Sequence, residues 1–320
     1  MKISLVVPCY NEENNIFPMY LEIKKVFENS AYSFETVFVD DGSRDKTYGE
    51  LKKLYEGFGD DNIRIIRFSR NFGKESAILA GLKNATGDYV TIIDADLQQR
   101  PEIALSMADF LEEHEEYDSV AAYQQNRKEN KTLSLFKKCF YKTINRISET
   151  EFVDGASDFR TFRRNVVESI LSVTEYHRFS KGIFSWVGFE TYYMPYTVEE
   201  RLNGESKWSF LKLFKYALDG IVAFTTFPLK LATFLGITTA LIALIYAVVV
   251  VIQKLFFEIA VPGYATIVVL ILLLGGLQLF ALGILGEYIS KIYIQVKNRP
   301  VYIVKEVLEC GKNKETSSDK

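Results

Sequence analysis

The sequence Tyr89-Val90-Thr91-Ile92-Ile93-Asp94-Ala95-Asp96-Leu97-Gln98 passes from an apolar run directly into two carboxylates that are one residue apart. A short apolar run of this kind predicts a buried strand. Two carboxylates at the end of such a strand can both reach a hard cation, and Mg²⁺ or Mn²⁺ there can bridge the phosphates of a nucleotide. An acidic surface loop is the alternative, because a bare Asp-x-Asp is common. The position directly after a strand favours a metal site at Asp94 and Asp96.

The chain before this stretch alternates between strand-like and helix-like segments. We expect strands at residues 3–7, 34–39, 63–68 and 89–93, and helices at residues 11–27, 47–55 and 75–85. Asn11 or Asn14 would cap the first helix. Such alternation predicts an α/β domain with right-handed crossovers and a mostly parallel, Rossmann-like sheet. Ligands bind at the carboxyl ends of these strands, so the polar clusters that follow the four strands should form one site.

Two long uncharged segments follow in the C-terminal third of the chain. Residues 231–252 and 263–286 contain no charged side chain. Each segment is long enough to cross a hydrocarbon core of about 30 Å as a helix. A soluble domain rarely buries two helices that are apolar all round, so a pair of buried core helices is the weaker interpretation. We therefore expect a transmembrane hairpin over residues 231–289.

The distribution of lysine and arginine orients this hairpin. The connection between the spans contains only Lys254, whereas the flanking segments contain Lys212, Lys215, Lys230, Lys291, Lys297, Arg299 and Lys305. The positive-inside rule therefore places a domain of residues 1–206 and a tail of residues 290–320 on the cytoplasmic side of the plasma (inner) membrane. Residues 207–230 are aromatic and basic, which suits an amphipathic helix in the lipid headgroup layer. An ordinary domain-packing helix is the alternative for that segment.

The composition excludes several classes of function. A net charge of −3 argues against a nucleic-acid partner, which normally requires a basic excess. The cysteines Cys9, Cys139 and Cys310 are too few and too scattered for a disulfide framework or a zinc site. Only His114 and His177 are present, so chemistry that needs a histidine pair is nearly excluded.

Motifs at the four strand ends carry a resemblance to a known family. They read Val7-Pro8-Cys9-Tyr10-Asn11-Glu12-Glu13, Val39-Asp40-Asp41-Gly42-Ser43, Arg70-Asn71-Phe72-Gly73-Lys74 and Asp94-Ala95-Asp96. In this order the chain resembles the family 2 glycosyltransferases, which have the GT-A fold. The likeness continues through Asp158-Phe159-Arg160 and Arg201-Leu202-Asn203-Gly204-Glu205-Ser206-Lys207-Trp208 into the two spans. That extended pattern is similar to the polyprenyl-phosphate branch, with its bactoprenol glucosyltransferases and dolichol-phosphate mannose synthases, and it covers residues 3–300.

The resemblance implies roles for the matching donor-side positions. Residues that would line the nucleotide pocket, or accept a hydrogen bond from its base or ribose, are Pro8, Tyr10, Glu12 and Asp41. Residues that would hold the metal ion and the diphosphate of a UDP-sugar are Asp94, Asp96 and Gln98. A turn residue at Asp41 and a packing aromatic at Tyr10 remain the alternatives.

On the acceptor side the resemblance implies undecaprenyl phosphate. Its phosphate oxygen is mostly ionised at neutral pH, so a general base is not required. The site needs groups that hold the phosphate, and the matching positions are Arg127, Arg160, Arg201, Ser206 and Lys207. Asp158 would act as a base or, as we favour, as an orienting carboxylate. The chain departs from the family pattern at Gln99-Arg100-Pro101 and at Gln124-Gln125, and the second departure weakens the assignment of Arg127.

The resulting hypothesis is inverting transfer of a sugar to undecaprenyl phosphate for modification of a cell-envelope glycan. Glucose from UDP-glucose is the first choice, N-acetylglucosamine the second, and the catalytic set is Asp96, Asp158, Arg201 and Lys207. A downstream flippase and a second glycosyltransferase would use the product, and small residues in the second span would permit a homo-oligomer. A processive polysaccharide synthase needs more spans to line a channel. A non-catalytic scaffold or flippase partner would have lost one of the paired aspartates.

Overall fold

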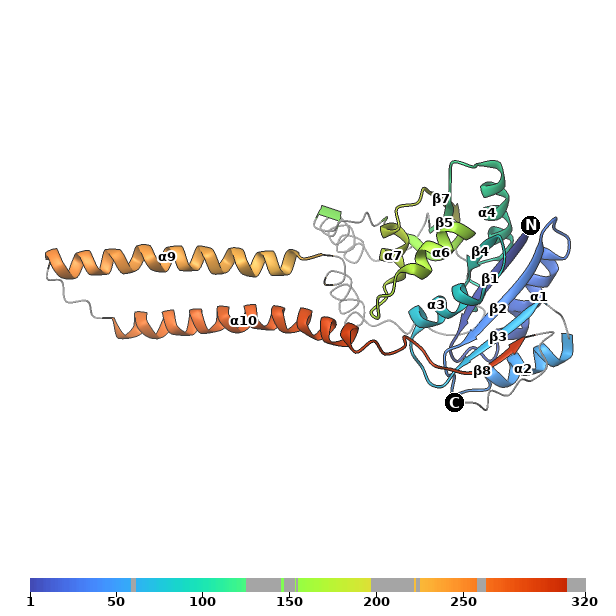
Figure 1. The fold of residues 1–320 in the computed structure, drawn as a ribbon, viewed down its shortest axis with the longest axis horizontal. Helices are drawn as coiled ribbons and strands as arrows, with labels where there is room; N and C mark the ends of the chain where they lie inside the picture. Colours follow the sequence, from blue (N-terminus) through green and yellow to red (C-terminus); the bar gives the residue numbers. More distant parts are fainter. Residues whose placement is uncertain are drawn as a thin grey trace. The chain divides into compact units, whose positions relative to one another are not determined.

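The computed structural model describes residues 1–58, 62–124, 145–146, 153, 155–196, 222, 225–257 and 263–309. The chain forms two compact units. The sheet unit comprises residues 1–146, 150–213 and 300–320, and the hairpin unit comprises residues 147–149 and 214–299. The chain thus returns to the sheet unit after it leaves the hairpin (Figure 1).

Among its described residues, the sheet unit has eight strands in the order β7-β5-β6-β4-β1-β2-β3-β8. Their bounds are β1 (Lys2–Cys9), β2 (Ser33–Asp40), β3 (Ile63–Phe68), β4 (Tyr89–Ile92), β5 (Ser119–Gln124), β6 (Ala156–Arg163), β7 (Thr191–Tyr196) and β8 (Val304–Glu309). The four strands β4-β1-β2-β3 are mutually parallel, and β5 and β7 also pair in parallel. The pairs of β4 with β6, β5 with β6 and β3 with β8 are antiparallel. The mostly parallel α/β sheet predicted from the sequence is confirmed.

Helices cover both faces of the parallel strands. They are α1 (Ile16–Phe27), α2 (Thr47–Phe58), α3 (Lys74–Asn84), α4 (Pro101–Glu113), α6 (Arg164–Ser172) and α7 (Ser180–Trp186). On one face, Leu5 and its neighbours of the same parity join a buried core with α1, α2 and α4. On the other face Val6 packs against α3 so closely that a Cβ atom on Gly81 would overlap its side chain. Both faces are buried, which explains why β1 and β4 are nearly continuous apolar runs rather than alternating ones.

The predicted strands and helices fall within a few residues of the observed ones, with one informative exception. Helix α1 begins at Ile16 rather than near Asn11, and its N-cap is Asn15, so the prediction that Asn11 or Asn14 caps the helix is wrong. Asn11 has a left-handed φ of 56°. Its backbone N–H donates to Ser43 Oγ (3.0 Å), which ties the segment after β1 to the turn after β2.

In its described part, the hairpin unit has two long helices, α9 (Phe227–Phe257) and α10 (Tyr264–Val296). The Tyr288 hydroxyl near the end of α10 donates to the Thr225 carbonyl just before α9 (2.7 Å), so the two helices run antiparallel. The candidate membrane spans are Phe227–Gln253 and Val269–Val296. Their most apolar stretches have mean hydropathies of 2.7 and 2.4, and no residue of these stretches is buried within the protein. Both helices extend beyond the predicted spans. Of the predicted interfacial segment, only residues 222 and 225–230 are among the described residues.

Strand β8 was not predicted. The sequence analysis assigned residues 290–320 to a separate tail, but Val304–Glu309 pairs with β3 at the edge of the sheet. This strand is largely exposed and contains the adjacent charged residues Lys305 and Glu306, so it lacks the apolar signature of a buried strand. Residues 310–320 lie outside the part of the chain that the structure describes.

Candidate active site

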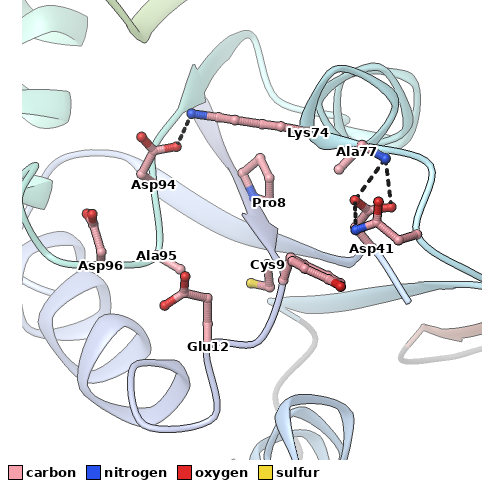
Figure 2. A pocket seen from close by; sticks show the side chains of 12 residues that line it. Pro8, Cys9, Glu12, Asp41, Lys74, Ala77, Asp94, Ala95 and Asp96 are labelled. Atoms are coloured by element: carbon pink, nitrogen blue, oxygen red, sulfur yellow. Dashed lines mark hydrogen bonds and ion pairs between the residues drawn. The ribbon is translucent and has the colours of Figure 1, made fainter. Parts of the chain in front are cut away.

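The carboxyl ends of β1 to β4 surround a pocket of about 290 Å³ (Figure 2). Its walls are formed by Pro8, Cys9, Tyr10, Glu12, Asp41, Asn71, Gly73, Lys74, Ala77, Asp94, Ala95 and Asp96. The structure thus brings together the four motifs that the sequence places at separate strand ends. The predicted donor-side residues all line this pocket except Gln98.

Two neighbours orient the Asp94 carboxylate. Its Oδ1 atom lies 2.6 Å from Lys74 Nζ, and Figure 2 shows the two groups pointing toward each other. Its Oδ2 atom accepts a hydrogen bond from the Gln99 side-chain amide (3.2 Å), whose oxygen accepts one from the Asp94 backbone N–H (2.9 Å). Gln99 is buried. This residue attracted notice in the sequence only as a departure from the family pattern, and its function as a clamp on Asp94 was missed.

Asp96 follows on a tight turn. Leu97 adopts a left-handed φ of 59°, and the Gln98 backbone N–H donates to Asp96 Oδ1 (3.2 Å). Among the described residues, no group of three or more His, Cys, Asp and Glu side chains gathers as a complete metal cage. Asp94 and Asp96 nevertheless fit Mg²⁺ or Mn²⁺, because such ions are commonly held by one or two carboxylates together with the oxygens of substrate phosphates.

Lys74 connects the two sides of the site. It begins α3, and its ammonium contacts Asp158 Oδ2 (3.4 Å) as well as Asp94. Burial alone would lower the pKa of Lys74, but the charges of Asp94 and Asp158 outweigh it and raise the pKa above its usual range. The sequence analysis quoted Lys74 within a motif but gave it no role. Only the fold reveals that it faces two carboxylates from distant parts of the chain.

Asp158 reaches this site through the register of β6. Ile92 of β4 pairs with Arg160 of β6 in an antiparallel sense, so Asp158 and Asp94 come to the same level two residues further along. Burial would raise the pKa of Asp158, but the positive charges of Lys74, Lys181 and Arg160 hold it below its usual range. A carboxylate with a lowered pKa is a weak base, which favours an orienting role over proton abstraction.

Arg160 and Glu75 shape the surroundings of Asp158. Arg160 is only 3% exposed, and its Nε donates to the Ser157 carbonyl (3.1 Å). Its positive charge supports the carboxylate of Asp158, and its predicted contact with the acceptor phosphate stays a prediction. Glu75 accepts hydrogen bonds from the backbone N–H (2.8 Å) and the hydroxyl of Ser180, the first residue of α7. This contact fixes the helix that carries Lys181.

Asp41 organises the loop that follows β3. Its carboxylate accepts hydrogen bonds from the Phe72 N–H (2.6 Å), the Gly73 N–H (2.9 Å) and the Asn71 side-chain amide (2.9 Å). Burial nevertheless raises its pKa, because those hydrogen bonds offset only part of the desolvation. Gly42 has a left-handed φ of 63°, and a Cβ atom there would clash with the backbone of the same loop. Asp41 therefore holds this loop and also lines the pocket, and its predicted contact with the base or ribose stays a prediction.

The other predicted acceptor-side residues cannot be placed. Arg127, Arg201, Ser206 and Lys207 lie outside the described residues. Their assignments stay predictions.

Comparisons with known proteins identify the family of this chain. The family described as glycosyl transferase family 2 matches residues 4–171, and the GtrB C-terminal hairpin matches residues 227–292. The putative glycosyltransferase CsbB of Bacillus subtilis is 42% identical over 305 residues, which cover 95% of this chain and 91% of that protein. The SfII prophage-derived bactoprenol glucosyl transferase of Shigella flexneri is 42% identical over 307 residues, which cover 96% and 98%.

Solved structures align less closely. That of S. aureus TarS residues 1–349 in complex with UDP-GlcNAc has a TM-score of 0.45 and 19% identity, and the alignment covers 70% of this chain and 66% of that chain. The family match spans the sheet and its pocket, and the relatives align over almost their entire length. The predicted family and GT-A fold are therefore confirmed, and the chain belongs to the family 2 glycosyltransferases with a GtrB-type C-terminal hairpin.

Proposed function

We propose that this enzyme transfers a sugar, with glucose from UDP-glucose as the first choice and N-acetylglucosamine as the second, to undecaprenyl phosphate. The observation that carries the proposal is the continuity of one chain from a donor pocket with paired aspartates into a hairpin of the GtrB type. Several relatives that match over both parts are named bactoprenol glucosyl transferases. That name motivates the lipid acceptor, and the pocket supports a nucleotide-sugar donor.

The donor diphosphate would occupy the space beside Asp94, Asp96 and Lys74. Asp94 and Asp96 would hold a divalent cation, which neutralises the charge that develops on the leaving diphosphate. Lys74 balances the negative charge of Asp94 and Asp158. Lys74 lines the pocket, so its ammonium would contact a phosphate oxygen of a bound donor as well.

The acceptor phosphate supplies its own nucleophile. One of its oxygens forms a bond to the anomeric carbon while the bond from that carbon to the diphosphate oxygen breaks, and no proton has to be removed from the attacking oxygen. Attack opposite the leaving group inverts the anomeric centre, so an α-linked donor gives a β-linked lipid phosphate. Positioning and charge stabilisation would then account for most of the rate enhancement. Asp158 would orient Lys74 and Lys181 rather than act as a base.

The hairpin would hold this site at a membrane surface. Both of its ends lead to the same sheet, because β7 precedes α9 and β8 follows α10 in the chain. A segment that spans a membrane twice and returns to one domain keeps that domain on one side. The excess of Lys and Arg outside the connection between the spans supports the cytoplasmic side.

The experiment that tests the proposal uses the purified full-length enzyme in detergent with Mg²⁺ or Mn²⁺. Undecaprenyl phosphate is supplied together with a panel of radiolabelled nucleotide sugars, and the label that passes into organic solvent is counted. We expect label from one UDP-sugar, with none after EDTA treatment or in the Asp96→Asn variant. An enzyme that binds UDP but labels no lipid from any donor would contradict the proposed acceptor.

A further inference from the structure

Residues 300–309 follow the second hairpin helix in the chain and include β8. They form a strap along the edge of the sheet unit (Figure 1). The strap pairs with β3 from Arg64 to Phe68. Beyond the end of β3, the Ser69 N–H donates to the Ile303 carbonyl (3.0 Å). The Ser76 hydroxyl of α3 donates to the Val301 carbonyl (3.4 Å). The strap therefore contacts the polypeptide on both sides of the loop Arg70–Lys74.

A row of side chains leads from this strap into that loop. The ring of Tyr302 stacks on Phe68, with centroids 4.8 Å apart and an interplanar angle of 13°. Phe68 in turn meets the ring of Phe72 edge to face at 5.8 Å. The guanidinium of Arg70 covers the ring of Phe72 at 4.0 Å. Phe68 is almost fully buried. Its ring lies between those of Tyr302 and Phe72 and connects the strap to the loop.

The loop at the end of this row forms part of the donor pocket. The backbone N–H of Phe72 is one of the groups that bind Asp41, and Asn71, Gly73 and Lys74 line the pocket. Gly73 has a left-handed φ of 99°. Glycine adopts positive and negative φ values about equally well, so the local sequence alone does not fix the conformation of the loop. A flexible glycine at this point needs support from tertiary contacts. The adjacent Phe72 receives such support from the ring of Phe68, on which Tyr302 stacks.

We propose that Tyr302 is a positioning residue for the donor site, and that the strap from the second membrane helix sets the conformation of the loop Arg70–Lys74. The inference deepens the proposed function, because it rests on the pocket as the nucleotide site. It does not depend on which lipid accepts the sugar. The chain segment that leaves the membrane is thereby part of the framework that binds the nucleotide.

The test measures binding of UDP with Mn²⁺ to the full-length enzyme in detergent, together with steady-state kinetics. Tyr302→Ala removes the stacked ring, and we expect the Kd for UDP and the KM for the nucleotide sugar to rise about five- to ten-fold, as loss of one aromatic pair predicts. The KM for the lipid phosphate and kcat at saturating donor should stay unchanged. Tyr302→Phe keeps the ring and should restore donor binding.

Val307→Ala provides the matched control, since Val307 lies on the same strap but is exposed and pairs with β3 away from the loop. Thermal unfolding verifies that each variant is folded, and Tyr302→Leu serves if the alanine variant is not. The inference is overturned if Tyr302→Ala, or the folded leucine variant, binds UDP as tightly as wild type. It is also overturned if Val307→Ala weakens donor binding equally. If wild-type enzyme itself binds no UDP, the donor assignment of the proposed function fails instead.

Discussion

The sheet and the hairpin are rich in the same types of apolar side chain but differ in whether these side chains are buried. Leu5 and Val6 in β1 are completely buried, whereas Leu272 and Leu279 in α10 are 70% and 71% exposed. In the sheet, apolar side chains are removed from water by contact with other parts of the protein. In the hairpin they face outward, which suits a lipid environment rather than water. The average composition of the chain conceals this division between two solvents.

This difference in burial indicates that the sheet and the hairpin have separate tasks. The chemistry is concentrated at the carboxyl edge of the sheet, where Asp94, Lys74 and Asp158 lie in contact. The candidate spans contain no such cluster among their described residues, and their expected task is to bring the active site to a lipid substrate. Substitutions in one region should therefore leave the task of the other region intact.

The largest effect is expected at the paired aspartates. Asp96→Asn removes a carboxylate that would hold the metal ion, and we expect transfer to fall by roughly 10³-fold or more. Membrane integration should remain as in wild type, because no apolar surface changes. Activity assays and carbonate extraction of membranes measure the two properties. Glu113→Gln, an exposed carboxylate on α4, is the matched control, and normal turnover by Asp96→Asn would contradict the metal assignment.

The reverse separation is expected in the hairpin. Leu272→Arg places a charge on an exposed face of a candidate span, which costs about 3 kcal/mol of insertion free energy. The variant should be depleted from the membrane fraction, while the protein that is recovered still binds UDP. Leu272→Ala should behave as wild type. Full membrane integration of the arginine variant would show that this part of α10 is not in contact with lipid.

A smaller effect is expected at Lys74. Lys74→Met removes the cation between Asp94 and Asp158, and the loss of one charge-assisted contact to the donor should weaken UDP binding by about 2 kcal/mol, or roughly 30-fold. Lys74 is also the positive charge that lowers the pKa of Asp158 most, so the pKa of Asp158 should rise in this variant. Isothermal titration calorimetry measures the binding. Lys74→Arg keeps the charge and should retain part of the affinity, and equal loss in both variants would argue against a charge effect.

The smallest change is expected in the pH dependence of Asp158→Asn. The folded-state pKa of Asp158 is lowered, so its carboxylate stays ionised at neutral pH. Any stability that it contributes is present above its unfolded pKa of about 3.9 and is lost only as the pH falls through the lower folded value. The acid limb of kcat/KM for the lipid should instead follow the acceptor phosphate, whose second pKa is near 6.

The midpoint of that limb should therefore be the same in wild type and in Asp158→Asn, although the absolute rate falls. Initial rates between about pH 5 and 8 at saturating UDP-sugar provide the comparison. Disappearance of the acid limb in the variant would identify Asp158 as a general base.

The sequence predicted what is local in the chain and missed what depends on distant contacts. Strands β1 and β4 were predictable because both of their faces are buried and their sequences are nearly continuous apolar runs. The paired aspartates were predictable because they directly follow such a run. Strand β8 escaped notice because it is an exposed edge strand with a mixed pattern.

The same distinction applies within the site. That Lys74 would contact both Asp94 and Asp158 depends on the register of β4 with β6, which no local pattern encodes. The clamp of Gln99 on Asp94 depends on the conformation of the turn between them. The hydrogen bonds that Asp41 accepts from the loop after β3 were also not predicted, because only the tertiary fold brings that loop beside it.

The most direct test of the central claim is the mass of the lipid after reaction. Purified enzyme, UDP-glucose, Mg²⁺ and undecaprenyl phosphate are incubated, and the extracted lipid is analysed by mass spectrometry. We predict undecaprenyl phosphate that has gained one hexose residue, in amounts equal to the UDP released. Release of UDP with an unmodified lipid would show that the sugar goes elsewhere, and it would contradict the account of this enzyme as a polyprenyl-phosphate glycosyltransferase.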